Sequence, residues 1–179
     1  MTNEMPGFDR VLFTEEQVRS RIREVGAEIS ERYQGKDLKL ICVLKGAVFF
    51  LTALAQAITI PVKIDFLAIS SFTSPTTLPG RVRIAKDLDY PIEGEDVLLI
   101  EDIVDTGFTS RFLLQNLAGR EPNTLGICTL LDRTERRIVQ VPVEFRCFEI
   151  PDRFVVGWGL DYRQLYRNQK DITVMKPEK

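Results

Sequence analysis

A short stretch in the middle of the chain combines the residue types needed to bind a phosphorylated sugar. Residues 98–110 read LLIEDIVDTGFTS: an apolar run, two acids, two apolar residues, and a loop of small and hydroxyl residues before a helix-like segment. Such a loop can direct successive backbone N–H groups and the positive end of a helix dipole at one phosphate. The two acids suit ribose hydroxyls, a magnesium ion or the removal of a proton.

Other interpretations of this stretch compete with a sugar-phosphate site. The chain has no Gly-x4-Gly-Lys-Ser/Thr P-loop and no Gly-x-Gly-x-x-Gly after a strand, and its one Asp-Thr-Gly lacks the second copy that an aspartic protease needs. The structural alternative is a strand that ends in an ordinary turn capped by Asp or Thr. The chain contains no histidine, so any general base must be a carboxylate, lysine, tyrosine or thiolate.

Three further clusters carry side chains that could reach the same ligand. In the first cluster, Lys45-Gly46 joins an apolar strand to a helix. In the second, residues 152–162, Phe154 could stack on a flat heterocycle and Asp161 offers a hard oxygen ligand. Arg133 places a cation at the end of another predicted strand. Each cluster also has a plain structural interpretation: a solvated lysine in a turn, a core aromatic, a carboxylate that begins a turn, and a surface arginine.

The bulk composition is that of one ordinary domain of 179 residues, with 44% hydrophobic and 28% charged residues. The net charge of −2 gives no basic surface for nucleic acid, so we expect no nucleic-acid partner. The first ten residues lack the pattern of a signal peptide, and Lys45 and Gln56 interrupt the longest apolar stretch, which argues against a membrane partner. Three cysteines in apolar runs suggest buried free thiols and a cytoplasmic location.

The elements that must position these side chains alternate between strands and helices. A capping box at Thr14 and an apolar stripe predict a helix that ends near Gly35. The pattern predicts two further helices, over 47–57 and 109–118, and strands over 38–44, 62–70, 81–86, 97–101, 124–131, 143–148, 154–156 and 172–175. This order indicates an α/β fold with a mainly parallel sheet flanked by helices, and the short late strands suggest a small hood subdomain.

Taken together, these motifs resemble the type I phosphoribosyltransferases, and within them the bacterial hypoxanthine-guanine phosphoribosyltransferases. The resemblance covers about residues 11–174 and also includes the segments FEIPD (148–152) and LDY (160–162), with Arg167 beyond. It implies a single phosphoribosyltransferase domain over 1–179, with the hood formed by the N-terminal segment and roughly 133–179. It also implies a homodimer or homotetramer.

The resemblance assigns roles residue by residue. Asp105 matches the catalytic general base. The residues that match phosphoribosyl-diphosphate contacts are Lys45, Gly46, Glu101, Asp102, Asp105, Thr106, Gly107, Phe108, Thr109 and Arg167. The purine contacts would be Arg133, Phe154, Val155 and Asp161, and the acids matching magnesium ligands are Glu101, Asp102 and Asp161.

The sequence departs from the family pattern at two places that matter. The flexible lid corresponds to residues 70–80 and usually carries Ser-Tyr, whereas this chain has Ser71-Phe72. At position 133 the family usually has a lysine that reaches the purine 6-oxo group, and this chain has arginine. The variable position of the phosphate loop is Phe108, which carries little weight.

The implied reaction transfers a 5-phosphoribosyl group from its diphosphate donor to N9 of hypoxanthine or guanine, with magnesium as cofactor, in purine salvage. Two alternatives remain. One is a nucleotide-sensing regulator on the same fold, which would usually need a basic surface or an added domain. The other is a relative that prefers xanthine or adenine, which the sequence resolves less well.

Overall fold

The computed structural model describes residues 7–71 and 82–176, built as two sheets and three helices. The larger sheet has the strand order β4-β3-β2-β5-β6-β7, in which only the β3–β4 pair is antiparallel. Its strands are β2 (Leu38–Leu44), β3 (Val62–Ser71), β4 (Val82–Lys86), β5 (Asp96–Val104), β6 (Thr124–Asp132) and β7 (Val143–Glu149). This confirms the predicted mainly parallel α/β fold.

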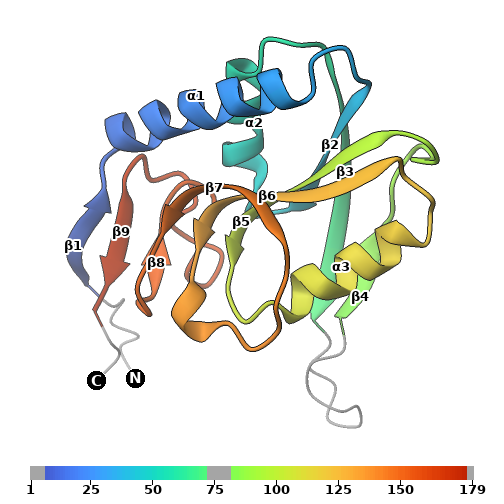
Figure 1. Ribbon diagram of the computed structural model, residues 1–179. Helices are drawn as coiled ribbons and strands as arrows, with labels where there is room; N and C mark the ends of the chain where they lie inside the picture. The colour runs from blue at the N-terminus through green and yellow to red at the C-terminus, as the bar shows by residue number, and fades with distance from the viewer. Residues whose placement is uncertain (1–6, 72–81, 177–179) are drawn as a thin grey trace, which may run out of the picture.

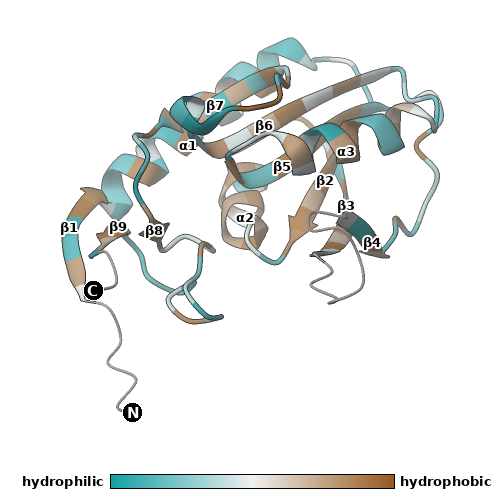
Figure 2. Cartoon of the chain, turned by 90° about the horizontal axis from the view of Figure 1, so that it is seen from below, coloured by the Kyte–Doolittle hydropathy of each residue, from teal (hydrophilic) through white to brown (hydrophobic). Residues whose placement is uncertain are grey.

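Helices cover both faces of this sheet (Figure 1). The helices are α1 (Glu15–Arg32), α2 (Val48–Ala57) and α3 (Phe108–Ala118), and a 3-10 turn follows β6 at Thr134–Arg136. One buried cluster unites α1 and α2 with one face of the sheet, and a second places α3 against the other face. In Figure 2, α2 and β2 are largely apolar, whereas α1 and α3 alternate between polar and apolar residues, as helices with one solvent-facing side do.

The first helix forms where the sequence predicts it. Thr14 accepts the N–H of Gln17, and the Gln17 side chain accepts the N–H of Thr14, so both halves of the capping box are present. The buried face carries the predicted apolar stripe of Val18, Ile22, Val25 and Ile29. None of the described helices is long and apolar enough to cross a membrane.

A second, antiparallel sheet forms the hood beside the main one, with the strand order β1-β9-β8 (Figure 1). Its strands are β1 (Phe8–Phe13), β8 (Val155–Val156) and β9 (Ile172–Met175). The family resemblance places the N-terminal segment in the hood, but the sequence pattern predicts no strand there. Phe13 of β1 stacks on Phe148 of β7 at 4.0 Å between ring centroids, which joins the hood to the main sheet.

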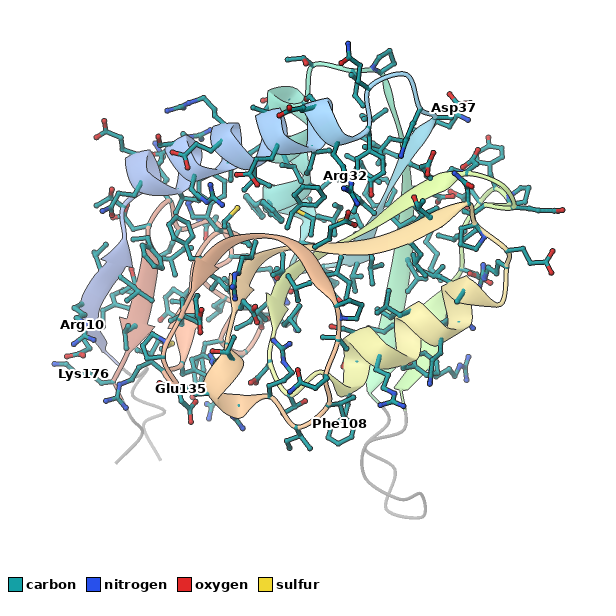
Figure 3. The ribbon with its side chains drawn as sticks, viewed as in Figure 1. Arg10, Arg32, Asp37, Phe108, Glu135 and Lys176 are labelled. Atoms are coloured by element: carbon teal, nitrogen blue, oxygen red, sulfur yellow. The ribbon has the colours of Figure 1, made fainter. Side chains whose placement is uncertain are left out.

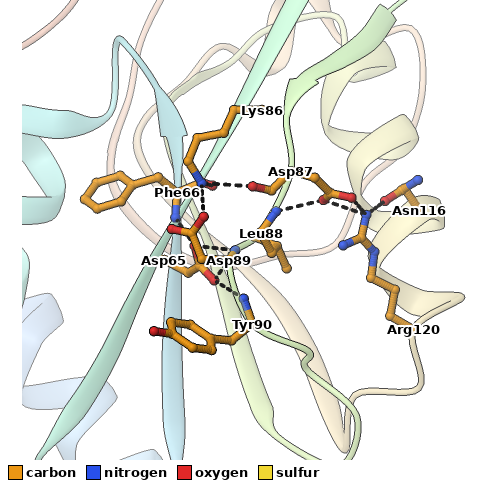
Figure 4. Close-up of polar contacts among 9 residues, drawn as sticks. All are labelled: Asp65, Phe66, Lys86, Asp87, Leu88, Asp89, Tyr90, Asn116 and Arg120. Carbon is orange, nitrogen blue, oxygen red and sulfur yellow. Dashed lines mark hydrogen bonds and ion pairs between the residues drawn. The ribbon is translucent and has the colours of Figure 1, made fainter.

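A polar cluster fastens the outer strands β3 and β4 to the chain that leads into β5 (Figure 4). The buried Asp65 carboxylate accepts the N–H groups of Asp89 and Tyr90 at 3.1–3.3 Å. Lys86 of β4 donates to the Phe66 carbonyl of β3 at 3.1 Å, which adds a side-chain contact between these two strands. These two strands flank residues 72–81.

Candidate active site

The two acids of the central motif lie inside β5 and point to opposite faces of the sheet. The predicted strand over 97–101 ends too early, because β5 continues through Asp102 and Ile103 to Val104. Consecutive strand residues face opposite sides. Glu101 is therefore buried on the side of α3, near Ser110, while Asp102 faces the Lys45-Gly46 turn.

Gly46 leaves the space that Asp102 needs. A Cβ atom at Gly46 would lie 1.7 Å from Oδ2 of Asp102, so no larger residue fits without moving that carboxylate. The preceding Leu44–Lys45 peptide bond is cis. The short Cβ–Oδ2 distance shows that the backbone of this turn lies against the acidic end of β5, and glycine is required there for close approach.

The two acids are held in an environment that disfavours their charge. Burial raises the pKa of Glu101 well above its usual value, with a further increase from the Asp102 carboxylate and a partial offset by the Ser110 hydroxyl. Burial also raises the pKa of Asp102 to about 6, opposed by the Ile103 N–H that its carboxylate accepts. Arg167 lowers and Asp161 raises this second pKa, so both hood residues act on the sheet carboxylate.

The loop after β5 is shaped as an anion cradle. Gly107 is the N-cap of α3 and has a φ of 89°, a left-handed conformation that glycine adopts without strain. No side chain caps this helix, so the first N–H groups of α3 are left for a ligand. Phe108, the first helical residue, is 55% exposed and lies on the outside of the turn (Figure 3).

A cavity of about 330 Å³ brings most of the predicted sugar-phosphate residues together. Its predicted members are Gly46, Glu101, Asp102, Asp105, Thr106, Gly107, Thr109, Asp161 and Arg167. Val43, Leu44, Ile69, Ile103 and Ser110 complete its lining. A larger hollow of about 520 Å³ lies between α1, α2 and residues 168–170, but it contains neither the loop nor the acid pair. The smaller cavity is therefore the candidate site.

The hood closes one side of this cavity through a turn that touches the main sheet. Arg167 forms an ion pair with Asp161 at 2.7 Å and donates to the Gly159 carbonyl at 2.6 Å. A Cβ atom at Gly159 would lie 1.8 Å from the Gly46 carbonyl oxygen. Two glycines thus meet where the hood and the sheet join.

Asp105 and Arg133 form a pair at the edge of the site. Oδ2 of Asp105 lies 3.2 Å from Nη1 of Arg133, and Nη2 of Arg133 donates to the Arg153 carbonyl at 2.6 Å. Two polar atoms of the pair are buried without a partner among the described residues: Oδ1 of Asp105 and Nε of Arg133. Arg133 is only 6% exposed, so the interpretation of this residue as a surface arginine is wrong.

The remaining predicted site residues lie outside the cavity lining. Lys45 is exposed, and Val155 is buried in β8. Phe154 is 53% exposed and meets Tyr162 edge-on, with 5.9 Å between ring centroids, so the interpretation of Phe154 as a core residue is also wrong. The predicted lid over 70–80 falls largely on residues 72–81; Phe72 and the side chain of Ser71 lie outside the described residues.

The carboxylates fit a magnesium ion only if a substrate supplies further oxygens. Among residues 7–71 and 82–176, no three Asp, Glu, His or Cys side chains are close enough to hold a metal by themselves. Oε1 of Glu101 is nevertheless buried without a partner. Magnesium is commonly held by one or two carboxylates together with substrate phosphates, and this donor set matches that mode.

The residues that support the loop from behind are not evident from the sequence. Asp132 and Arg137 form a buried ion pair, and Arg136 lies 3.6 Å from Asp105. The run RTERR at 133–137 indicates a basic segment. The sequence of such a run does not distinguish arginines that are exposed in a loop from arginines that are buried in ion pairs. Only the tertiary arrangement distinguishes them.

The raised pKa of Asp102 predicts that Asp102→Asn stabilises the metal-free protein at neutral and alkaline pH. A carboxyl whose pKa is about 6 when folded and about 3.9 when unfolded contributes stability that is fully present below about pH 4. That stability is lost as the pH rises through about 6. Two pKa units correspond to about 3 kcal/mol, so the variant should gain up to about that much at pH 8.

Urea unfolding with a chelator, over a series from about pH 4 to about pH 8, measures this effect. The gain should shrink towards the acid end of the series. If Asp102→Asn is no more stable than the wild-type protein at pH 8, the charged Asp102 carboxylate does not destabilise the fold and its pKa is not raised.

Comparison with known proteins agrees with this geometry. The family model for the phosphoribosyl transferase domain matches residues 12–163. The hypoxanthine-guanine phosphoribosyltransferase of Mycobacterium avium is 48% identical over 173 residues, which cover 93% of this chain and 85% of that protein. That of Streptococcus agalactiae is 42% identical over 169 residues, 94% of each chain.

Solved structures show the same likeness. A hypoxanthine phosphoribosyltransferase from Staphylococcus aureus superimposes with a TM-score of 0.90 at 43% identity, over 95% of this chain and 92% of that one. A Trypanosoma cruzi hypoxanthine phosphoribosyltransferase, captured as a ternary substrates complex, superimposes with a TM-score of 0.90 at 38% identity over 95% of this chain. With the family model over most of its length and relatives that are 42–48% identical, this chain belongs to the phosphoribosyltransferase family, in its hypoxanthine-guanine branch.

Proposed function

We propose that this protein transfers the 5-phosphoribosyl group of phosphoribosyl diphosphate to N9 of hypoxanthine or guanine and releases diphosphate, as a purine-salvage enzyme. One observation carries the proposal: a single cavity combines an anion-binding helix start, the two acids of β5 and a hood turn with a cation. A 5′-phosphate, a ribose and a diphosphate need these three surfaces in this order. Regulators on the same fold need such a cavity too, so activity must decide between them.

The sugar phosphate would lie along the end of β5. The N–H groups of Thr106 to Thr109 would hold the 5′-phosphate. Glu101 and Asp102 point to opposite faces of the sheet but line the same cavity, and both would lie near the ribose hydroxyls. Lys45, Gly46 and Arg167 would bind the diphosphate; the support for this is that Gly46 and Arg167 line the same cavity wall. Cations and N–H groups there would stabilise charge on the departing diphosphate.

The purine would lie between the hood and Asp105. Phe154 would stack on its ring, and the Val155 backbone would meet its edge. The unpartnered Oδ1 of Asp105 and Nε of Arg133 are an acceptor and a donor, which matches the N7–H and O6 of a 6-oxopurine. As N9 bonds to C1 and the C1–diphosphate bond breaks, Asp105 would take the N7 proton.

Magnesium is the proposed cofactor, with Glu101, Asp102 and Asp161 as its candidate ligands. When bound it would offset the negative charge of the diphosphate. The lid over residues 70–80 would exclude water from the activated sugar. A cytoplasmic location, a single domain with its hood, and a homodimer or homotetramer belong to the proposal as predictions, with no nucleic acid or membrane as partner.

A spectrophotometric assay with magnesium and phosphoribosyl diphosphate tests the function. We expect diphosphate release with hypoxanthine and with guanine, and none with adenine, because an arginine offers only donors to the 6-amino group. Xanthine as the purine tests the remaining alternative: a faster reaction with xanthine than with hypoxanthine or guanine would indicate the xanthine-preferring relative. An RNA gel shift on the same preparation addresses the regulator: RNA binding without purine-dependent diphosphate release would overturn the proposed enzyme.

A further inference from the structure

Residues 133–139 lie behind the phosphate loop and donate hydrogen bonds to three consecutive carbonyl groups. These belong to Val104, the last residue of β5, and to Asp105 and Thr106. The Val104 carbonyl accepts the N–H of Arg133 at 2.9 Å, and the Thr106 carbonyl accepts the N–H groups of Ile138 and Val139 at 3.0 and 2.9 Å. A Cβ atom at Gly107 would lie 2.2 Å from the Val139 carbonyl oxygen, so the two segments are in close contact.

The middle carbonyl, that of Asp105, is held by a side chain instead of the backbone. Nε of Arg137 donates to it at 2.9 Å, and Nη2 of Arg137 also donates to the Val104 carbonyl at 3.2 Å. The same Nη2 pairs with the Asp132 carboxylate at the end of β6. The side chains of Arg137 and Asp132 are only 8% and 4% exposed, so this fork is buried.

Fixing a carbonyl also fixes the N–H of the next residue. In a planar trans peptide the C=O and N–H point in opposite directions. Holding the carbonyls of Val104, Asp105 and Thr106 on the side of residues 133–139 therefore turns the next three N–H groups away, those of Asp105, Thr106 and Gly107. These residues line the cavity, and none of these N–H groups donates to a backbone carbonyl of the described residues.

We propose that Arg137 is a positioning residue: anchored by Asp132, it sets the plane of the Asp105–Thr106 peptide and so aims the Thr106 N–H at the 5′-phosphate. Arg137 itself contacts no substrate in this arrangement. It acts at the junction between the general base and the cradle. The inference rests on the proposed function, because it assigns the cradle to a 5′-phosphate.

Two ligands separate the cradle from the rest of the site. Ribose 5-phosphate probes the cradle, and inorganic diphosphate probes the Lys45, Gly46 and Arg167 side. Arg137→Met should weaken ribose 5-phosphate binding in calorimetry by about tenfold, within the range for a lost hydrogen bond to a charged acceptor such as phosphate. Diphosphate binding should stay within about twofold, a change too small to represent a lost contact.

Matched variants keep the test decisive. Arg146 is also paired with Asp132, at 3.1 Å, but its side chain is 50% exposed and makes no hydrogen bond to the described part of the loop. Arg146→Gln should leave both affinities unchanged. Arg137→Lys keeps the buried charge, so it should fold even if Arg137→Met does not, yet an ammonium lacks the planar fork and should still weaken ribose 5-phosphate selectively.

Each outcome has one meaning. Selective loss of ribose 5-phosphate affinity in the Arg137 variants supports the inference. Equal loss of both ligands, or unchanged affinity for ribose 5-phosphate, would show that Arg137 only stabilises the fold and would overturn it. If the wild-type protein binds neither ligand and releases no diphosphate in the purine assay, the proposed function fails and this inference fails with it.

Discussion

Replacing the proposed base, Asp105→Asn, is expected to lower kcat by about 10²–10⁴-fold, the usual contribution of a general base. The chain has no histidine that could take over. Asparagine has nearly the same shape and can still accept from Arg133, so the pair should persist while the proton acceptor is lost. Phosphoribosyl-diphosphate binding should be retained, because the cradle uses backbone N–H groups.

Asp152→Asn provides the matched control for this variant. Asp152 is also a carboxylate next to Arg136, at 3.8 Å, but its side chain is 56% exposed. We expect near wild-type rates from it. Single-turnover measurements should report the chemical step directly. An Asp105→Asn enzyme that keeps more than about a tenth of the wild-type chemical rate would refute the assignment of Asp105 as the base.

The second large effect concerns Arg133, where the family usually has lysine. Arg133→Ala is expected to lower kcat/KM for hypoxanthine and guanine by about 10–150-fold, the equivalent of a hydrogen bond from a charged donor. Arg133 links Asp105 to the Arg153 carbonyl, next to the proposed stacking residue Phe154. Its loss would remove the proposed O6 donor and leave the proposed base, Asp105, without its buried cation.

Affinity for phosphoribosyl diphosphate should barely change in Arg133→Ala. Alanine keeps the backbone N–H that donates to the Val104 carbonyl, and the lost side chain contacts the Asp105 carboxylate, not the N–H groups of the cradle. Arg133→Lys should recover part of the purine activity, since an ammonium can still donate to a 6-oxo group. Arg136→Ala serves as the control: Arg136 also lies near Asp105, but its side chain is 47% exposed. Undiminished hypoxanthine turnover in Arg133→Ala would mean that another group reads O6.

Local sequence predicts the parts of this protein that depend on local interactions. The capping box at Thr14 and the glycine at position 107 each act within one turn, and the structure has both where the pattern predicts them. The extent of β5 was underestimated because two acids usually end a buried strand. Here Glu101 and Asp102 remain in the ladder, at a cost visible in their raised pKa values.

Long-range contacts could not be predicted in the same way. Strand β1 is mostly exposed and lacks an alternating pattern, and it forms because β9, far along the chain, pairs with it. Arg133 and Arg137 read as one basic run, yet both are buried, because Asp105 and Asp132 come from different strand ends that meet only in the folded sheet.

The contact between Gly46 and Gly159 limits how this fold can be recombined. Gly46 lies in the turn after β2, and Gly159, with a φ of 99°, lies in the hood. A side chain at Gly159 would overlap the Gly46 backbone, and a side chain at Gly46 would overlap Asp102. A chimera that takes its hood from a relative should therefore assemble only if that relative carries glycine at the position of Gly159. The absence of a side chain at this contact is therefore a condition for joining any hood to this main sheet.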